Sequence, residues 1–572
     1  MTDKQGNQYK IKRFSFCTYG EILAVTVFFL VLWFFLTRYA GGPIYSDEAM
    51  YINHGLMGVK DPFVLNRYTH IFFQRLFTAL ANTPLEGVRA FWGFLVAGSA
   101  VFTYTISRLA TKASNPIQAV ISTLLYLSIP LLVVYSGNTA VDITAGFFVS
   151  LLVIIFMFYF RNPKQPAILL GLMGFIFFLA FRTKETTLVS AILLIGFLFD
   201  ETGKISFRVF LRRMALFLLG VVAGVVLFIL LNGVLLGDPW FGLRINDFTR
   251  FTGSYVEGNI TGEAKPVANW FSDYLFTETL YIFMAFILSS VVTFRQQKLP
   301  MRLPWLVPLM LIALLSLIIG FSSWGVVPRH IFPVLPLICA FAPQLIVFDT
   351  PKTKKEWLWL VLSMCFGALL FFISRRLLVK ASLLGPYYYP DFLASTVYPI
   401  TLIALISLVF FFKKYSVKTI ILPVMLFAIF IAYPLYYNGV QFFLVQTNVR
   451  KMNERLLVIE AFNNQFDSSK ETRILVFEDA LYYMNDSSRH AEFISLFNTY
   501  FDARLTTDEV KMTNRDLFTP NMLAEWQPNF ILMSAADYES TVVNKYLMSL
   551  DSADVEHMRS SDQHFMLFSR GD

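Results

Sequence analysis

The sequence is poor in charge and in cysteine, and both shortages restrict what the protein can be. Only 15% of its 572 residues are charged, whereas 56% are hydrophobic. A soluble domain does not cover its surface with such a composition, so we expect an integral membrane protein. The three cysteines, Cys17, Cys339 and Cys365, fall in or near predicted cytoplasmic or intramembrane segments, which leaves none outside to form a disulfide.

Other absences exclude further classes. The sequence has no basic stripe with interleaved aromatic residues, no internal repeat and no low-complexity tract. Its net charge of +8 follows from the Lys and Arg that the cytoplasmic loops of membrane proteins carry. We therefore expect the lipid bilayer as a partner and no nucleic acid.

Long apolar runs are what the sequence has instead. About thirteen of them have the roughly 17 to 25 residues that a membrane-spanning helix needs. They begin near Ile22, Val88, Pro116, Ile143, Ala167, Thr186, Met214, Tyr274, Leu303, His330, Trp357, Phe392 and Thr419. No small-residue cleavage site follows the first run, which indicates a retained signal-anchor. With the N-terminus in the cytoplasm, the basic clusters fall in cytoplasmic turns.

The pattern predicts a mostly α polytopic membrane protein with a small α/β domain. Residues 1–437 form the predicted membrane domain, and residues 438–572 form a soluble extracytoplasmic domain, because their composition shifts towards Asp, Glu, Asn, Ser and Lys. Within the second domain, the periodicity indicates strands at 473–478, 529–533 and 564–568 and helices near 449–463 and 492–503.

Two predicted external loops, about 38–87 and 237–272, are long enough to carry functional residues. In the first, residues 49–58 and 64–80 place apolar side chains at helical spacing beside polar ones. This pattern is typical of helices that lie in the membrane interface.

Acidic residues occur at two predicted outer positions. Asp47 and Glu48 follow the first span, and Asp142 lies in the polar break between the third and fourth spans. Each position also has a plain structural explanation: acids are common at helix N-termini, and a short connector must contain some polar residue. The location of both on one membrane face favours a catalytic role.

Basic residues occur at two further outer positions. Arg182 and Lys184 lie between the fifth and sixth spans, on the side opposite to the one that the positive-inside rule favours, and Arg329 and His330 precede the tenth span. Cations at a membrane edge are functional candidates, although either position could be an accident of topology. Carboxylates and cations together could deprotonate a hydroxyl and hold a phosphate. A sugar that leaves from a lipid phosphate needs no acid, since positive charge alone stabilises the departing anion.

A metal is a weaker expectation. His54 and His70 in the first loop could join Asp47 or Glu48 as ligands, since imidazole and carboxylate together suit several divalent metals. No compact zinc-type spacing is present, and interfacial histidines are the alternative. The sequence indicates no certain cofactor and leaves a divalent metal open.

Four short motifs in this order resemble the GT-C superfamily of polytopic glycosyltransferases, in its branch of protein mannosyltransferases and aminoarabinose transferases. They are Ser46–Tyr51, Asn138–Asp142, Arg182–Glu185 and Arg329–Pro336, and the run Gly87–Phe91 is also similar. The resemblance covers roughly residues 20–345.

The resemblance implies an inverting transfer of a monosaccharide from a polyprenyl-phosphate donor to a hydroxyl acceptor. The acceptor would be a protein, a lipid-linked glycan or an envelope polysaccharide, at the outer face of a bacterial cytoplasmic membrane. Asp47 would be the catalytic base beside Glu48, and Asp142 would orient the acceptor or the sugar. The donor phosphate would meet the cations at Arg182, Lys184, Arg329 and His330.

The chain departs from the usual motifs of aminoarabinose transferases at two places. Residues 66–70, Asn-Arg-Tyr-Thr-His, stand where a Lys-Pro-Pro-Leu-like stretch is usual, and Glu185-Thr186 stands where Gly-Pro is common. These departures argue against lipid A as the acceptor.

Two other function classes suit the same composition. A transporter or flippase would also have many spans and scattered charges, but its sites usually lie at the midplane between repeats, whereas the charges here gather at one edge. An assembly protein without catalysis would use the C-terminal domain to bind a partner, and it would tolerate substitution of the acidic and basic candidates.

Overall fold

The structure, a computed structural model, consists of a helical body and a small sheet. It describes residues 19–40, 51–52, 54–56, 58, 60, 66–110, 116–127, 129, 132, 141–162, 165–200, 203–247, 286, 299–321, 328–345, 473–477, 510–513, 518–534, 555–559 and 565–570.

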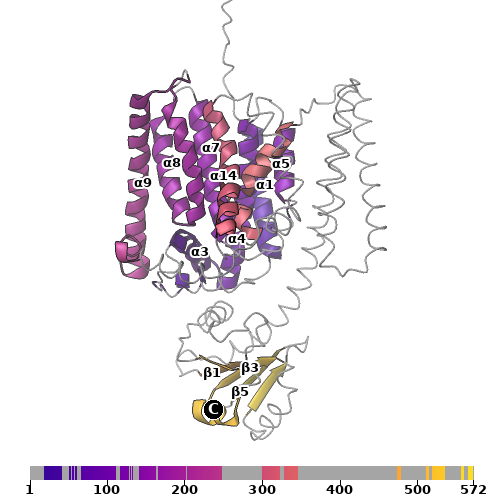
Figure 1. The fold of residues 1–572 in the computed structure, drawn as a ribbon. Coiled ribbons are helices and arrows are strands. Elements are labelled where there is room, and N and C mark those ends of the chain that lie inside the picture. Colours follow the sequence, from indigo (N-terminus) through magenta and orange to yellow (C-terminus); the bar gives the residue numbers. More distant parts are fainter. Residues whose placement is uncertain are drawn as a thin grey trace, which may run out of the picture.

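Apolar helices make up the helical body (Figure 1). The α-helices are α1 (Tyr19–Tyr39), α3 (Tyr68–Leu80), α4 (Pro84–Ala110), α5 (Ile117–Leu127), α7 (Val141–Arg161), α8 (Ala167–Phe181), α9 (Phe207–Leu236), α14 (Leu299–Phe321) and α15 (Leu335–Phe341). The 3₁₀ helices are η2 (Glu185–Leu198), η4 (Pro328–Val334) and η5 (Ala342–Leu345).

In the part of the chain that the structure describes, five helices have the length and composition of a membrane span. They are Gly20–Arg38, Glu86–Ala110, Val141–Arg161, Phe207–Leu236 and Leu299–Leu317. Shorter apolar helices occupy the runs predicted near Pro116, Ala167, Thr186 and His330. The chain is therefore a multi-pass membrane protein. The total of thirteen stays a prediction, because the runs near Tyr274, Trp357, Phe392 and Thr419 lie outside the described residues.

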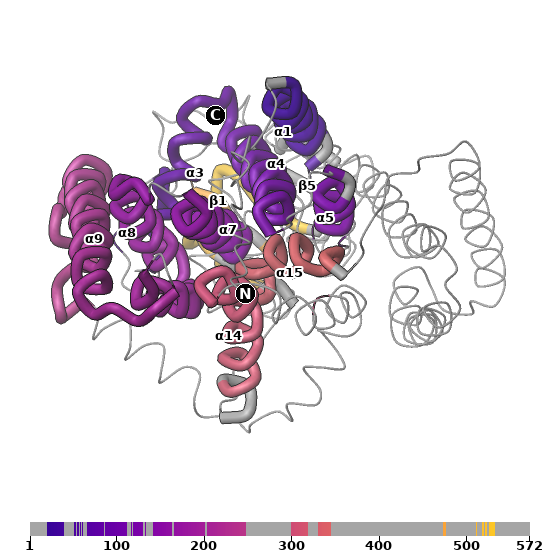
Figure 2. The backbone as a smooth tube through the Cα atoms, turned by 90° about the horizontal axis from the view of Figure 1, so that it is seen from above, coloured from indigo at the N-terminus to yellow at the C-terminus, as the bar shows by residue number. Residues whose placement is uncertain are grey.

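Helix α7 is the centre of the body. In its most apolar window 78% of the residues are buried, compared with 6% in α1 and 22% in α9, so α1 and α9 turn most of their surface towards lipid. Viewed along the helices, α7 lies among α4, α8 and α15 (Figure 2). A polar group on α7 is thus enclosed by protein, where it must find a partner.

The sixth predicted span is a 3₁₀ helix rather than an α-helix. In η2 the buried residues include Thr187, Ser190, Leu193 and Gly196, which recur every third residue, as three residues per turn requires. The Thr187 hydroxyl donates to the Lys184 carbonyl oxygen (2.8 Å), and the Ser190 hydroxyl donates to that of Thr187 (2.6 Å). With a rise of about 2 Å per residue, these 14 residues extend about 28 Å, close to the thickness of the bilayer core.

Helices α8 and α9 approach one another through glycines. A Cβ atom on Gly174 would overlap the carbonyl oxygen of Phe217, and one on Gly220 would overlap that of Gly171. Close backbone approach at small residues is the usual way in which helices associate in lipid. This packing fixes the position of the turn that follows α8.

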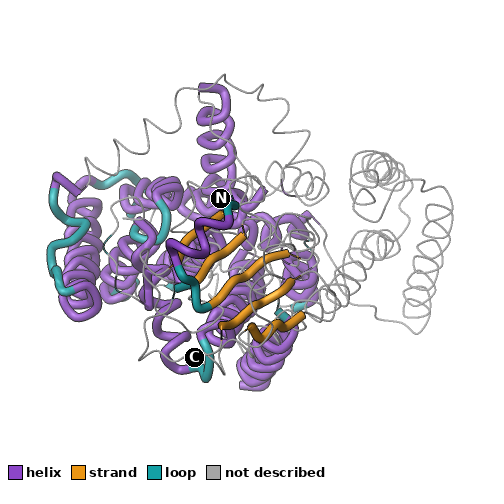
Figure 3. Tube along the Cα trace, turned by 90° about the horizontal axis from the view of Figure 1, so that it is seen from below, coloured by secondary structure: helices purple, strands orange, loops and turns teal. Residues whose placement is uncertain are grey.

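The C-terminal part contains a five-stranded sheet in the order β2-β1-β3-β5-β4 (Figures 1 and 3). Its elements are β1 (Ile474–Phe477), β2 (Val510–Thr513), α22 (Pro520–Trp526), β3 (Phe530–Ser534), β4 (Val555–Arg559) and β5 (Phe565–Arg570). Strand β1 pairs in parallel with β2 and β3, whereas β5 pairs antiparallel with β3 and β4. Strands β1, β3 and β5 lie where the sequence predicts them. The predicted helices near 449–463 and 492–503 lie outside the described residues.

We expect Gly174→Ala to destabilise the protein, while Gly171→Ala does not. Both changes give α8 the same gain in helix propensity. The new methyl of Gly174→Ala meets backbone, whereas a Cβ on Gly171 has its nearest neighbour, the Leu216 carbonyl oxygen, at 3.8 Å. Thermal unfolding in one detergent should show a loss of about 1–3 kcal/mol for Gly174→Ala only. Equal melting temperatures for the two variants would contradict this packing.

Candidate functional site

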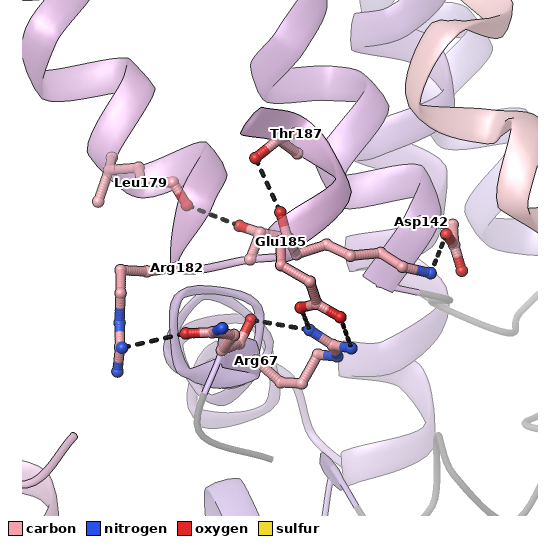
Figure 4. A network of polar contacts seen from close by, with 9 residues as sticks. Arg67, Asp142, Leu179, Arg182, Glu185 and Thr187 are labelled. Carbon is pink, nitrogen blue, oxygen red and sulfur yellow. Dashed lines mark hydrogen bonds and ion pairs between the residues drawn. The ribbon is translucent and has the colours of Figure 1, made fainter. Parts of the chain in front are cut away.

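A buried carboxylate lies at the start of α7. Asp142 occupies the first helical turn, where an acid is favoured by the helix dipole, and only 1% of the residue is exposed. Its Oδ1 accepts a hydrogen bond from the Lys184 ammonium group, and the two side chains form an ion pair (Figure 4). Because both side chains are buried, this pair is screened little by water.

The turn between α8 and η2 aims Lys184 at Asp142. The backbone N–H groups of Thr183 and Lys184 both donate to the Ala180 carbonyl oxygen (3.0 Å each), which closes the end of α8. The Thr183 hydroxyl donates to the Leu179 carbonyl oxygen (2.9 Å). Burial lowers the pKa of Lys184, and the Asp142 carboxylate opposes this shift by favouring the ammonium form.

Arg182, two residues earlier, points elsewhere (Figure 4). Its guanidinium donates to Asn66 Oδ1 (3.1 Å) and to the Gly242 carbonyl oxygen (3.4 Å). It also lies over the Phe228 ring, with Cζ 4.3 Å from the centroid. Two cations for which the sequence predicts one role therefore make different contacts, and Arg182 joins α3 to α9 and the segment that follows α9.

His70 connects α3 to α7. Its Nδ1 lies 2.8 Å from the Thr144 hydroxyl, two residues after Asp142, and its ring meets the Tyr51 ring edge-on at 5.8 Å. Burial, with a smaller contribution from the positive charge of Arg67, lowers the pKa of His70 to about 3, although the Asp142 carboxylate opposes the shift. The imidazole is therefore neutral at physiological pH.

The fourth motif reaches α7 as well. A Cβ atom on Gly146, one helical turn after Asp142, would lie 2.5 Å from the Phe332 carbonyl oxygen, so η4 packs directly on this helix. Arg329 and His330 both belong to η4, and His330 is half-buried. Segments from three of the four sequence motifs therefore meet at the first turns of α7, and the first motif is linked to them indirectly, through the contact of Tyr51 with His70.

Several predicted site residues are not tested by this geometry. Asp47 and Glu48 lie outside the described residues. His54 belongs to a short helical stretch of the first loop. In the ranges that the structure describes, no group of three or more His, Cys, Asp or Glu residues could hold a metal ion.

Sequence reasoning missed one strong contact of the site. Arg67 donates to both carboxylate oxygens of Glu185, at 2.7 and 3.2 Å. The signal in the sequence was that both residues stand in the two segments that depart from the usual motifs. Nothing in the sequence indicated that these segments meet.

Comparison with known proteins identifies the fold. No protein-family model and no curated protein sequence matches the chain. Among solved structures, ArnT from Cupriavidus metallidurans bound to undecaprenyl phosphate is similar over 97% of this chain and 98% of its own, with a TM-score of 0.57 and 15% identity. ArnT in the apo state is similar over 96% and 98%, with a TM-score of 0.57 and 14% identity. ArnT, an aminoarabinose transferase, belongs to the GT-C superfamily. The resemblance to the GT-C fold is confirmed.

We expect the Asp142–Lys184 pair to show strong coupling in stability. Lys184→Met leaves a buried carboxylate without its lysine partner, which should cost about 3–5 kcal/mol. The double variant Asp142→Leu/Lys184→Met removes both charges and should unfold at a higher temperature than Lys184→Met alone. The measurement is thermal unfolding of the purified variants in detergent. Additive losses in the double variant would show that the two side chains do not interact.

We also expect His70 to make stability depend on pH. In the unfolded chain its pKa is about 6.5, whereas in the folded protein it is about 3. Between these values the unfolded state binds more protons, so stability falls as pH drops from about 6.5 towards 3. His70→Gln lacks this titration. The difference in melting temperature between wild type and His70→Gln should therefore shrink from pH 7 to pH 5, and a constant difference would count against the burial of a neutral imidazole.

Proposed function

We propose that the protein is an inverting glycosyltransferase. It transfers a monosaccharide from a polyprenyl-phosphate donor to a hydroxyl acceptor at the extracytoplasmic face of the cytoplasmic membrane. The observation that carries the proposal is the buried Asp142–Lys184 pair at the first turn of α7, where segments of three motifs converge. The GT-C fold, shared along the whole length with an ArnT that was solved with undecaprenyl phosphate, supports the same class of donor.

The chemistry needs a base and a cation. The acceptor oxygen attacks the anomeric carbon, the bond from that carbon to the phosphate oxygen breaks, and the configuration inverts. The hydroxyl proton passes to a carboxylate, which we assign to Asp47 with Glu48 beside it. The polyprenyl phosphate leaves as a monoester and carries one more negative charge than it did in the diester. That charge is what a nearby ammonium group stabilises.

Lys184 suits this role better than Arg182 does. An ammonium group has three donors, so Lys184 can keep its bond to Asp142 and still donate to a phosphate. In Arg182, by contrast, Nη1 donates to both Asn66 and Gly242, and the guanidinium lies over the Phe228 ring. We therefore assign the phosphate to Lys184, with Arg329 and His330 as further candidates on η4, and we assign to Asp142 the orientation of Lys184 and of the acceptor or sugar.

The donor site can be tested with undecaprenyl phosphate. This ligand should raise the melting temperature of the wild-type protein by mass action, and Lys184→Met should bind it more weakly, with a smaller rise at the same ligand concentration. Each variant is compared with its own ligand-free form, because Lys184→Met is itself destabilised. Glu86→Gln is the matched control for Asp142→Asn, since Glu86 is an exposed acid in the first turn of α4. Only Asp142→Asn should weaken binding.

Turnover tests the base. With undecaprenyl-phosphate monosaccharides as donors and an envelope fraction as the source of acceptors, mass spectrometry follows the release of undecaprenyl phosphate. Asp47→Asn should retain ligand binding and lose release by at least about a hundredfold. Wild-type release by Asp47→Asn would exclude this assignment. Movement of an intact lipid-linked substrate across vesicles without release would favour the transporter class instead.

A further inference from the structure

A bidentate ion pair joins the start of α3 to the turn that carries Lys184. Arg67 Nη1 donates to Glu185 Oε2 at 2.7 Å, and Nη2 donates to Oε1 at 3.2 Å (Figure 4). The two side chains are only 11% and 27% exposed. This parallel arrangement is the strongest geometry for an arginine and a carboxylate, because it fixes orientation as well as distance.

Two other contacts reinforce the same junction. The backbone N–H of Thr69 donates to the Arg182 carbonyl oxygen (3.3 Å), and the Arg182 guanidinium donates to Asn66 Oδ1 (3.1 Å). Residues 66–69 and residues 182–185 are thus held together by side chains and by backbone. A shift of α3 along the membrane surface would move this turn with it.

Glu185 directly follows Lys184, the lysine that pairs with Asp142 in the site. Lys184 and Glu185 are neighbours in the chain, and each is tied by its side chain to a different element: Lys184 to α7 and Glu185 to α3. With both side chains anchored, the peptide between them has little freedom to rotate. The ammonium group of Lys184 is therefore held on a short, doubly fixed segment.

We propose that Arg67 and Glu185 are positioning residues that fix Lys184 for the donor phosphate. The inference rests on the proposed function, and it adds a role to two residues that stand where the chain departs from the usual motifs. The guanidinium of Arg67 already holds a carboxylate with both of its outer nitrogens. Its effect on the donor therefore passes through the turn and through Lys184.

The test is a charge swap read out by affinity for undecaprenyl phosphate. Arg67→Ala and Glu185→Ala should each weaken binding about tenfold, because Lys184 loses its fixed orientation. The variant that carries both Arg67→Glu and Glu185→Arg restores the pair with reversed polarity, and it should bind within about threefold of wild type. The matched control is Arg244→Ala, which breaks the more exposed Arg244–Asp238 pair (2.7 Å) and should leave affinity unchanged.

A double-mutant cycle distinguishes positioning from a general loss of structure. In a Lys184→Met background, Arg67→Ala should have no further effect on affinity, since the group that it positions is gone. A purely structural role would lower the melting temperature without this coupling. Independent, additive losses of affinity from Arg67→Ala and Lys184→Met would overturn the proposal, as would failure of the charge swap to restore binding.

Hydrogen exchange of the ligand-free protein separates this proposal from the proposed function. Residues 182–187 should exchange faster in Arg67→Ala and return to the wild-type rate in the charge swap, whatever the donor is. Unchanged exchange over these residues would overturn the positioning role. Restored exchange, together with no binding of undecaprenyl phosphate by wild type, would instead reject the proposed donor and leave the fixed turn in place.

Discussion

The ion pair between Asp142 and Lys184 is the interaction on which the rest of the site depends. A carboxylate on the most enclosed of the five span-length helices that the structure describes must be compensated, and the compensating charge comes from a turn between two other helical segments. That requirement fixes the end of α8, the start of η2 and the first turn of α7 relative to one another. Close packing of η4 against Gly146 then fixes the position of the fourth motif on α7.

The sequence identified the residues of this pair for reasons unrelated to their contact. Asp142 was conspicuous as the polar break between two apolar runs, and Lys184 as a cation on the side where the positive-inside rule disfavours one. Neither argument says how far apart the two side chains lie in the folded protein. The difference between Lys184 and Arg182 was also beyond the sequence, because it depends on which way each side chain leaves the turn and on Asn66 and Gly242, which come from distant parts of the chain.

Secondary structure was predictable to a different extent in the two parts of the chain. Apolar runs located the helices, yet 3₁₀ geometry in η2 shows only in its period of three, which a run of nearly uniform hydrophobicity conceals. In the sheet, the predicted strands β1, β3 and β5 are the three inner ones. Strands β2 and β4 escaped prediction because they lie at the edges, where Lys511 and Glu556 interrupt the apolar pattern.

Whether a helix contributes to the site depends on whether it faces the lipid or the rest of the protein. Helices α1 and α9 expose most of their apolar surface, so the bilayer is their main neighbour and neither contributes to the Asp142–Lys184 pair. The two ion pairs of the site lie instead where α3, α7 and the turn after α8 meet, and α3 is at the end of the body that Figure 1 shows nearest to the sheet. There the dipeptide Lys184-Glu185 links α7 to the start of α3 through two ion pairs of different geometry. Because a lysine makes a point contact and an arginine makes a planar fork, the Glu185 side of the dipeptide would set orientation in the proposed donor site, while the Lys184 side would keep donors for the phosphate.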